Sequence, residues 1–231
     1  MGEQITGKKG SSFLYGAIIV LAIIALGFFA LRGGSDSKRT DVQVSEKDII
    51  IGEKNAAITI VEFTDFSCPY CAAAEGKNIE AINYLKSNDA SWQSPIPNIY
   101  ENYVKTGKAR IVVKYYPGHG QGQEAHRVGW CLYEQIPERF DDYKKKVFAD
   151  QENANNIELM KEYAVSAGAD KEKINQCLAS KRYEGNFNSQ MLDGMNAGVK
   201  GTPTFFVNGL KIEGAASYSE FQKIIESELS Q

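Results

Sequence analysis

Two cysteines separated by two residues are the side chains of this sequence best suited to chemistry, in the motif Cys68-Pro69-Tyr70-Cys71. Residues 57–63 before the motif are typical of a β-strand, and a helix-forming stretch begins at Ala72. Unpaired backbone N–H groups at a helix start stabilise an anion, so we expect Cys68 to have a lowered pKa and to act as a thiolate. Cys68 would then attack a disulfide, and Cys71 would resolve the mixed disulfide.

The same cysteine spacing also occurs in haem attachment and in zinc sites. Haem attachment requires a histidine after the second cysteine, where this chain has Ala72. A zinc site requires two further ligands, and the other cysteines, Cys131 and Cys177, are isolated in the sequence. His119 and His126 have no neighbours that suggest a metal site or a triad, so we expect both to be structural or exposed. We therefore expect no metal and no cofactor.

The first part of the chain predicts a membrane anchor. Residues 13–31 are apolar and uncharged, long enough to span a bilayer, and follow Lys8 and Lys9. The positive-inside tendency puts residues 1–12 in the cytoplasm and the rest outside. A cleaved signal peptide is the alternative, but the run is long and lacks a small-x-small cleavage site. We expect a single-pass protein of the cytoplasmic membrane, with its domain on the extracytoplasmic side.

Composition is consistent with a globular domain in an oxidising compartment. Residues 33–45 are polar and predict a flexible tether, followed by one domain over residues 46–231. With 43% hydrophobic residues the chain can form a core. Its 26 basic and 29 acidic side chains include no basic cluster, so nucleic acid is not expected as a partner. Four cysteines, an even number, suit an exported domain in which disulfides persist.

The first predicted strand, residues 57–63, is apolar on both faces. Ile58, Ile60 and Glu62 fall on one face, and Val61 and Phe63 on the other. Such a strand belongs in the centre of a sheet that is covered on both sides by helices. A helix to about residue 86, a polar loop with Pro95 and Pro97, a short helix to about residue 106 and a strand over residues 110–116 follow.

Residues 123–196 read as consecutive helices and predict a helical insertion between strands. Apolar residues recur there at helical spacing, as on buried helix faces: Val128, Cys131 and Leu132; Ile157, Met160 and Ala164; Ile174, Cys177 and Leu178. A hairpin with an Asn208-Gly209 turn follows, between strands at residues 204–207 and 210–212. The last helix begins with the capping-box pattern of Ser217 and Glu220.

This order of elements resembles the DsbA-like branch of the thioredoxin superfamily. The resemblance covers about residues 49–229. Its most specific parts are residues 62–71, Glu-Phe-Thr-Asp-Phe-Ser-Cys-Pro-Tyr-Cys, and residues 198–209, Gly-Val-Lys-Gly-Thr-Pro-Thr-Phe-Phe-Val-Asn-Gly. The resemblance implies an α/β thioredoxin-like fold with an inserted helical domain. It also implies dithiol–disulfide exchange with cysteine-containing proteins.

The resemblance also assigns roles to residues outside the cysteine motif. Pro203 matches the cis-proline that faces the active-site cysteines, and Thr202 would present its backbone to an extended substrate segment. Glu62 matches the acidic residue under the active-site helix, where burial would favour its neutral form and let it exchange a proton with Cys71. A Glu that reaches water at a strand end is the alternative. Asp65 reads as a loop or capping residue.

A structural disulfide between Cys131 and Cys177 is implied too, because some DsbA-like proteins have a second cysteine pair in this region. Two packed free thiols are the alternative reading. Tyr70 stands where the most oxidising relatives have histidine, and it supplies no positive charge to the Cys68 thiolate. We therefore expect a pKa of about 4.5 to 6.5 for Cys68.

The resulting prediction is a membrane-anchored thiol oxidase that introduces disulfides into exported proteins. Its partners would be cysteine-containing exported proteins and a quinone-linked membrane reoxidant. A disulfide isomerase or reductase is the alternative within redox chemistry, and a threonine before the proline, as in Thr202, also occurs in isomerase-type relatives. A non-catalytic peptide-binding module is a third reading, and the intact pair of Cys68 and Cys71 argues against it.

Overall fold

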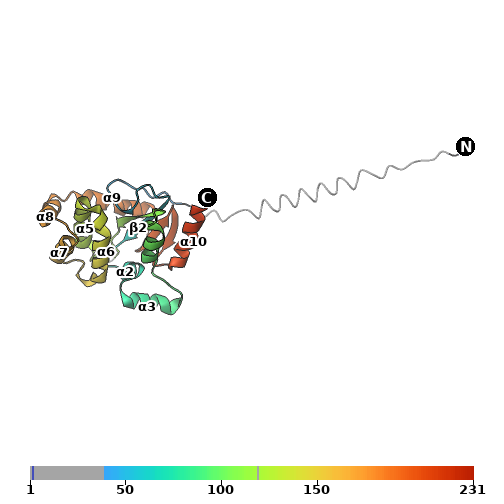
Figure 1. Cartoon of the computed structure of the whole chain (residues 1–231), viewed down its shortest axis with the longest axis horizontal. Coiled ribbons are helices and arrows are strands. Elements are labelled where there is room, and N and C mark those ends of the chain that lie inside the picture. Colours follow the sequence, from blue (N-terminus) through green and yellow to red (C-terminus); the bar gives the residue numbers. More distant parts are fainter. Residues whose placement is uncertain (1, 3–38, 119) are drawn as a thin grey trace. The chain divides into compact units, whose positions relative to one another are not determined.

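The structure is a computed structural model that describes residue 2 and residues 39–118 and 120–231. The predicted transmembrane segment 13–31, residues 33–38 of the predicted tether, most of the cytoplasmic segment 1–12 and His119 lie outside the described residues. No helix in the described part of the chain is long and apolar enough to cross a membrane. Residues 39–231 form one unit, coloured from blue to red in Figure 1.

The sheet of this unit has five strands in the order β1-β3-β2-β4-β5. The strands are β1 (Ile49–Gly52), β2 (Ile58–Thr64), β3 (Ala109–Tyr115), β4 (Thr204–Val207) and β5 (Leu210–Glu213). β2 is central, as predicted, and runs parallel to β3 and antiparallel to β4. β1 pairs antiparallel with the other side of β3 and was not among the predicted strands.

In the described part of the chain, α-helices lie between β2 and β3, between β3 and β4, and after β5. The α-helices are α2 (Pro69–Ala74), α3 (Ile79–Asn88), α4 (Pro95–Ile99), α5 (Gln123–Gln135), α6 (Phe140–Ala149), α7 (Ile157–Ser166), α8 (Lys171–Ser180), α9 (Tyr183–Asn196) and α10 (Tyr218–Leu229). Short turns of π- or 3-10 helix lie at Tyr100–Val104, Pro137–Arg139 and Gln151–Asn153. Helices α5 to α9 fill the predicted insertion 123–196, and Figure 1 shows α5 to α8 grouped on one side of the sheet-bearing core.

The two faces of β2 contribute to two separate cores. Ile58 and Ile60 lie in the larger core together with apolar side chains of α2, α4, α5, α6 and α10. Val61 and Phe63 lie in a smaller core with Phe206 on the opposite face. A Cβ at Gly194 of α9 would lie 3.1 Å from the Phe63 ring, so glycine lets this helix approach the sheet closely. The alternation predicted for residues 57–63 is therefore confirmed.

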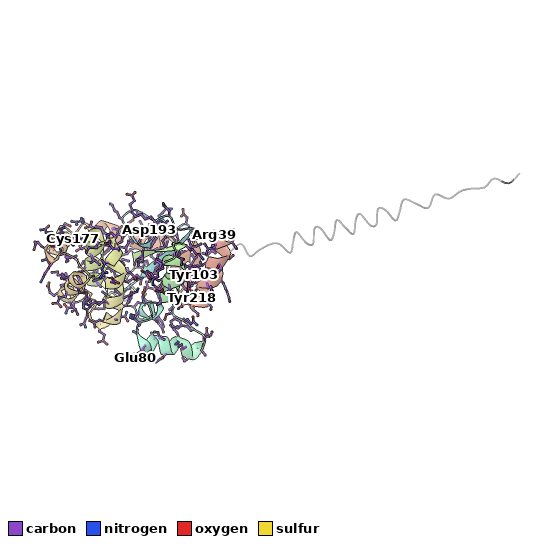
Figure 2. All side chains as sticks on the ribbon, viewed as in Figure 1. Arg39, Glu80, Tyr103, Cys177, Asp193 and Tyr218 are labelled. Atoms are coloured by element: carbon purple, nitrogen blue, oxygen red, sulfur yellow. A yellow bond between two sulfur atoms is a disulfide. The ribbon has the colours of Figure 1, made fainter. Side chains whose placement is uncertain are left out.

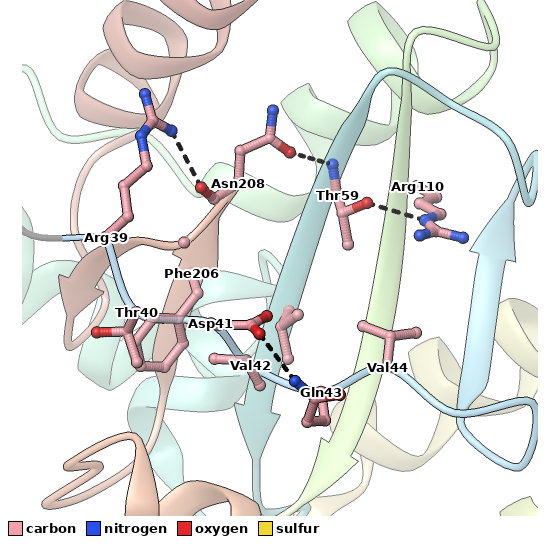
Figure 3. Close-up of a pocket in the computed structure, with 12 residues that line it drawn as sticks. Arg39, Thr40, Asp41, Val42, Gln43, Val44, Thr59, Arg110, Phe206 and Asn208 are labelled. Carbon is pink, nitrogen blue, oxygen red and sulfur yellow. Dashed lines mark hydrogen bonds between the residues drawn. The ribbon is translucent and has the colours of Figure 1, made fainter.

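The rest of the second face is covered by residues 39–45, which we call the N-terminal strap (Figure 3). Val42 and Val44 pack on the smaller core, and Thr40 N donates to the carbonyl oxygen of Gly209 at 2.9 Å. Figure 3 shows the strap crossing in front of the sheet. Strap and sheet residues together line a cavity of about 480 Å³. The flexible tether predicted for residues 33–45 thus does not extend over residues 39–45, because alternate side chains of this segment pack on an apolar sheet face.

Three local predictions differ from the structure. The helix predicted from Ala72 to about residue 86 begins earlier, at Pro69, and is divided into α2 and α3, because Gly76 and Asn78 adopt positive φ angles of 73° and 58°. The predicted loop with Pro95 gives way to α4, which begins at that proline, a position where no backbone donor is needed. In the last helix, Ser217 is the N-cap residue but its side chain makes no capping hydrogen bond.

Candidate active site

The two cysteines of the motif lie where β2 passes into α2. Cys68 is the N-cap residue of α2 and Pro69 its first residue. Both cysteines are free thiols with no exposed surface. The Cys68 thiol donates a hydrogen bond to the carbonyl oxygen of Thr202 at 3.2 Å, and the Thr202–Pro203 peptide bond is cis. The structure therefore brings together the cysteine motif and the Thr202–Pro203 pair, which are 134 residues apart in the chain.

The two thiols have opposite acid–base character. The hydrogen bond from the Cys71 thiol, supported by backbone N–H groups at the start of α2, lowers the pKa of Cys68 to about 5 although burial opposes the shift. This pKa lies within the range predicted from the sequence. Burial, followed by the neighbouring Cys68 sulfur, raises the pKa of Cys71 well above its ordinary value. The site thus separates a thiolate at Cys68 from a protonated thiol at Cys71.

A buried lysine between two buried glutamates lies next to the motif. Lys144 Nζ of α6 lies 2.6 Å from Glu62 Oε2 of β2 and 2.5 Å from Glu75 Oε1, and the three side chains are at most 1% exposed. Burial lowers the pKa of Lys144, but the two carboxylates raise it above its ordinary value. Burial raises the pKa of Glu75 to about 7, against the opposing effect of Lys144.

Glu62 is buried, as expected, but its partner differs from the predicted one. It binds Lys144, and the described residues show no hydrogen bond between Glu62 and Cys71. Its second carboxylate oxygen has no hydrogen-bond partner in that part of the chain. The proton relay from Glu62 to Cys71 stays a prediction.

The redox loop, residues 65–68, is fixed by the carboxylate of Asp65. This carboxylate accepts hydrogen bonds from Ser67 N at 2.9 Å and from Gly118 N at 2.8 Å. A Cβ at Gly122 would lie 2.3 Å from Asp65 Oδ1, and a Cβ at Gly118 would lie 2.5 Å from Thr202 Oγ1. Glycines therefore allow the segment after β3 to pass directly over the redox loop. Asp65 is a loop residue, as predicted.

A glutamine from the helical insertion reaches the same loop. Gln151 Nε2 donates to the carbonyl oxygens of Phe66, at 2.9 Å, and Cys68, at 2.8 Å. Its Oε1 accepts from Asn78 Nδ2 at 3.0 Å. His126 packs on the Phe66 ring at 4.4 Å between centroids, and burial lowers its pKa to about 3, so it is a neutral, structural residue. The insertion thus contacts the redox loop through both packing and hydrogen bonds.

The remaining predicted pair lies in the helical insertion. Cys131 of α5 and Cys177 of α8 are joined in a disulfide with a Cα–Cα distance of 5.8 Å. Both residues are buried. Figure 2 labels Cys177 at the end of the unit that α7 and α8 occupy. The disulfide links two helices of the insertion, and neither cysteine belongs to the redox loop.

The sequence interpretation did not identify Lys144, Glu75 or Gln151. Glu75 follows Cys71 by four residues, a helical spacing that places both on one side of a continuous turn. Lys144 shares a helical spacing with Phe140 and Phe148, which predicts the buried face of α6. These two signals were present in the sequence. Gln151 has none, because two of its three hydrogen bonds go to backbone carbonyl groups.

The comparisons with known proteins agree with this fold. A family model described as thioredoxin matches residues 44–85 and 89–227. Disulfide bond formation protein D of Bacillus subtilis is 24% identical over 187 residues, which cover 78% of this chain and 76% of that protein. Na(+)/H(+) antiporter NhaA 3 of Salinispora tropica is 28% identical over 173 residues, which cover 73% of this chain but only 23% of the antiporter. The chain thus spans about a quarter of that relative.

Two solved structures have a similar fold. Oxidised BdbD from Bacillus subtilis has a TM-score of 0.66 at 21% identity and covers 84% of this chain and 98% of its own. Alpha-DsbA1 from Wolbachia pipientis has a TM-score of 0.65 at 20% identity and covers 82% of this chain and 94% of its own.

Proposed function

The chain belongs to the thioredoxin family, with the DsbA-like combination of a thioredoxin fold and a helical insertion, and on this premise we propose that it is a thiol:disulfide oxidoreductase that introduces disulfides into exported proteins. The observation that carries the proposal is the pair of unlike thiols. Cys68 has a pKa of about 5 and contacts the Thr202 carbonyl, whereas burial raises the pKa of Cys71. A dithiol with one acidic and one buried sulfur suits directed exchange.

The reaction begins with the oxidised pair. A substrate thiolate attacks Cys68 Sγ, the Cys68–Cys71 bond breaks, and Cys71 leaves with the electron pair and takes up a proton. A second substrate thiolate then attacks the substrate sulfur of the mixed disulfide and releases Cys68 as a thiolate. The substrate loses two electrons and two thiol protons, and the cysteine pair gains the electrons. A leaving thiolate with a pKa of about 5 favours this direction.

Location and partners belong to the same proposal. The uncharged apolar run at residues 13–31 after Lys8 and Lys9 supports an anchor in the cytoplasmic membrane with the domain outside. Exported proteins with cysteines are the proposed substrates, in line with the name of disulfide bond formation protein D. After each cycle the reduced pair needs an electron acceptor, for which we propose a quinone-linked protein of the same membrane.

Oxidative refolding of a reduced protein with several disulfides tests the proposal. The oxidised full chain in detergent should accelerate disulfide formation, and Cys68→Ser and Cys71→Ser should both abolish it because neither can form the Cys68–Cys71 bond. When the substrate is supplied with its disulfides formed, Cys71→Ser should accumulate a mixed disulfide, because Cys68 attacks a substrate disulfide and no second thiol resolves the product. If the chain only rearranges disulfides that are already present, the isomerase alternative is correct. If the unsubstituted chain leaves the rate unchanged, the proposed function is wrong.

A further inference from the structure

Two exposed tyrosine rings lie close together, and one of them belongs to the cysteine motif. Tyr70, inside the cysteine motif, is 39% exposed, and Tyr84 of α3 is 58% exposed. Their ring centroids are 6.4 Å apart with the planes at 60°. Among the described residues the large exposed apolar side chains are six: Tyr70, Ile79, Tyr84, Val165, Leu192 and Met195. Three of them lie on α2 and α3, the helices that adjoin Cys68.

Helix α3 contributes little to the core. Of its ten residues only Ala81 is buried. In Figure 1, α3 lies next to α2 at the lower edge of the unit, away from α5 to α9, and Figure 2 labels its residue Glu80 there. Because the Tyr84 ring remains largely in solvent, it contributes little burial energy to the packing of α3. Exposed aromatic side chains grouped at a reactive sulfur indicate binding of another molecule.

The position of α3 relative to Cys68 is fixed by hydrogen bonds. The Asn78 side chain caps α3 by accepting from Ala81 N at 3.1 Å, and its Nδ2 donates to Gln151 Oε1 at 3.0 Å. The same glutamine donates to the Cys68 carbonyl oxygen at 2.8 Å. One amide group therefore holds both the start of α3 and the backbone of Cys68, which fixes the helix that carries Tyr84 relative to the cysteine motif.

We propose that Tyr70 and Tyr84 form a recognition shelf for a large apolar side chain, aromatic above all, next to the substrate cysteine. This inference rests on the proposed function and adds a substrate preference to it. Any polypeptide whose sulfur reaches Cys68 must pass Tyr70, because the two residues are separated only by Pro69 at the start of α2. The neighbouring residue of an extended peptide lies only about 3.3 Å further along, so it too would lie close to the start of α2, which carries Tyr70.

The chemistry of the two rings determines which residue next to the substrate cysteine should be preferred. Neither tyrosine carries a charge, and aromatic rings pack on one another in edge-to-face or offset arrangements. Tyr84 therefore attracts an aromatic or aliphatic neighbour of the substrate cysteine and offers nothing to a small polar one. The shelf acts on the choice of substrate, whereas the acidity of Cys68 acts on the exchange itself.

Two synthetic peptides test the shelf. They contain one cysteine and differ only in the residue next to it, phenylalanine or serine. The rate constant for attack of each peptide thiol on the oxidised full chain in detergent is measured by stopped-flow, and the ratio of the two constants is compared between variants. We expect Tyr84→Ser to lower this ratio about two- to tenfold, the range of one aromatic pair. Tyr84→Phe should retain it.

Leu192→Ser is the matched control, because Leu192 is 56% exposed on α9 and its substitution should leave the ratio unchanged. A ratio that is unchanged in Tyr84→Ser, or that falls equally in Leu192→Ser, overturns the shelf and leaves the proposed function intact. If neither peptide thiol reacts with the Cys68–Cys71 disulfide of the unsubstituted chain, the proposed function is wrong and the shelf fails with it.

Discussion

Replacement of the buried lysine should destabilise the protein in a pH-dependent way. Lys144 Nζ lies 2.6 Å from Glu62 Oε2 and 2.5 Å from Glu75 Oε1, with all three side chains at most 1% exposed. Lys144→Met keeps the length of the side chain but leaves two buried carboxyl groups without a cation. Removal of one partner from a buried ion pair costs about 3 to 5 kcal/mol. We expect the free energy of unfolding to fall by about that amount at pH 8.

At pH 5 the loss should be smaller, because the carboxyl groups can then become neutral at little cost. A glutamate with an ordinary pKa of 4.5 takes up a proton at pH 5 for about 0.7 kcal/mol, and at pH 8 for about 5 kcal/mol, at 1.36 kcal/mol per pH unit. Since a neutral carboxyl group needs no cation beside it, we expect the loss in Lys144→Met to fall to about 1 to 2 kcal/mol at pH 5.

The unsubstituted chain should show a weaker dependence of the same sign. Burial raises the pKa of Glu75 from 4.5 to about 7, so the folded chain holds this proton over a range in which the unfolded chain has lost it. Stability therefore falls as the pH rises from 4.5 to 7, by about 3 kcal/mol from this group. Below pH 4.5 both states are protonated and the group contributes no difference.

Urea unfolding followed by circular dichroism at pH 5 and pH 8 measures both effects. Lys145→Met is the matched control on the same helix, since Lys145 is 42% exposed and binds Asp141 at 2.6 Å. Its substitution should change the free energy of unfolding by less than about 1 kcal/mol at either pH. A loss in Lys144→Met that is equal at the two pH values, or no larger than that of the control, would refute the electrostatic interpretation.

Three further predictions concern the thiol, the disulfide and the loop contact. Absorbance at 240 nm should show the Cys68 thiolate titrating near pH 5, and a midpoint above pH 8 would contradict the proposed nucleophile. Replacing Cys131 and Cys177 by serine should lower the free energy of unfolding by about 4 kcal/mol, the chain-entropy value for their separation of 46 residues; an unchanged urea midpoint would argue against it. Gln151→Leu should lower the free energy of unfolding by about 1 to 3 kcal/mol, because the buried carbonyl groups of Phe66 and Cys68 lose their donor. Glu152→Leu, at the exposed neighbouring position, should lower it clearly less.

The parts of the site that are contiguous in sequence were predictable. The strand, the turn and Cys68 with Cys71 occur in one short stretch, where periodicity and spacing are both visible. The Thr202–Pro203 pair required the family resemblance, because sequence alone favours a trans proline. Its cis bond and its contact with Cys68 agree with what the resemblance implies.

The parts decided by tertiary contacts were not predictable. The spacing of Lys144 from Phe140 and Phe148 indicates a buried position, but the sequence does not show what neutralises its charge there. The carboxylates that surround it lie 82 and 69 residues away in the chain. Residues 39–45 look like a polar tether, yet Val42 and Val44 alternate and cover a sheet face. In both cases the local pattern does not contain the partner surface.

The reduction potential of the Cys68–Cys71 pair tests the oxidase proposal most directly. DsbA, with a nucleophile pKa of about 3.5, lies near −120 mV, and thioredoxin, with about 7, lies near −270 mV. Cys68, with a pKa of about 5, lies between them, so equilibration with glutathione should give a potential between about −130 and −230 mV. Tyr70→His should make the pair more oxidising. A potential below about −250 mV would contradict the proposal that this dithiol donates disulfides.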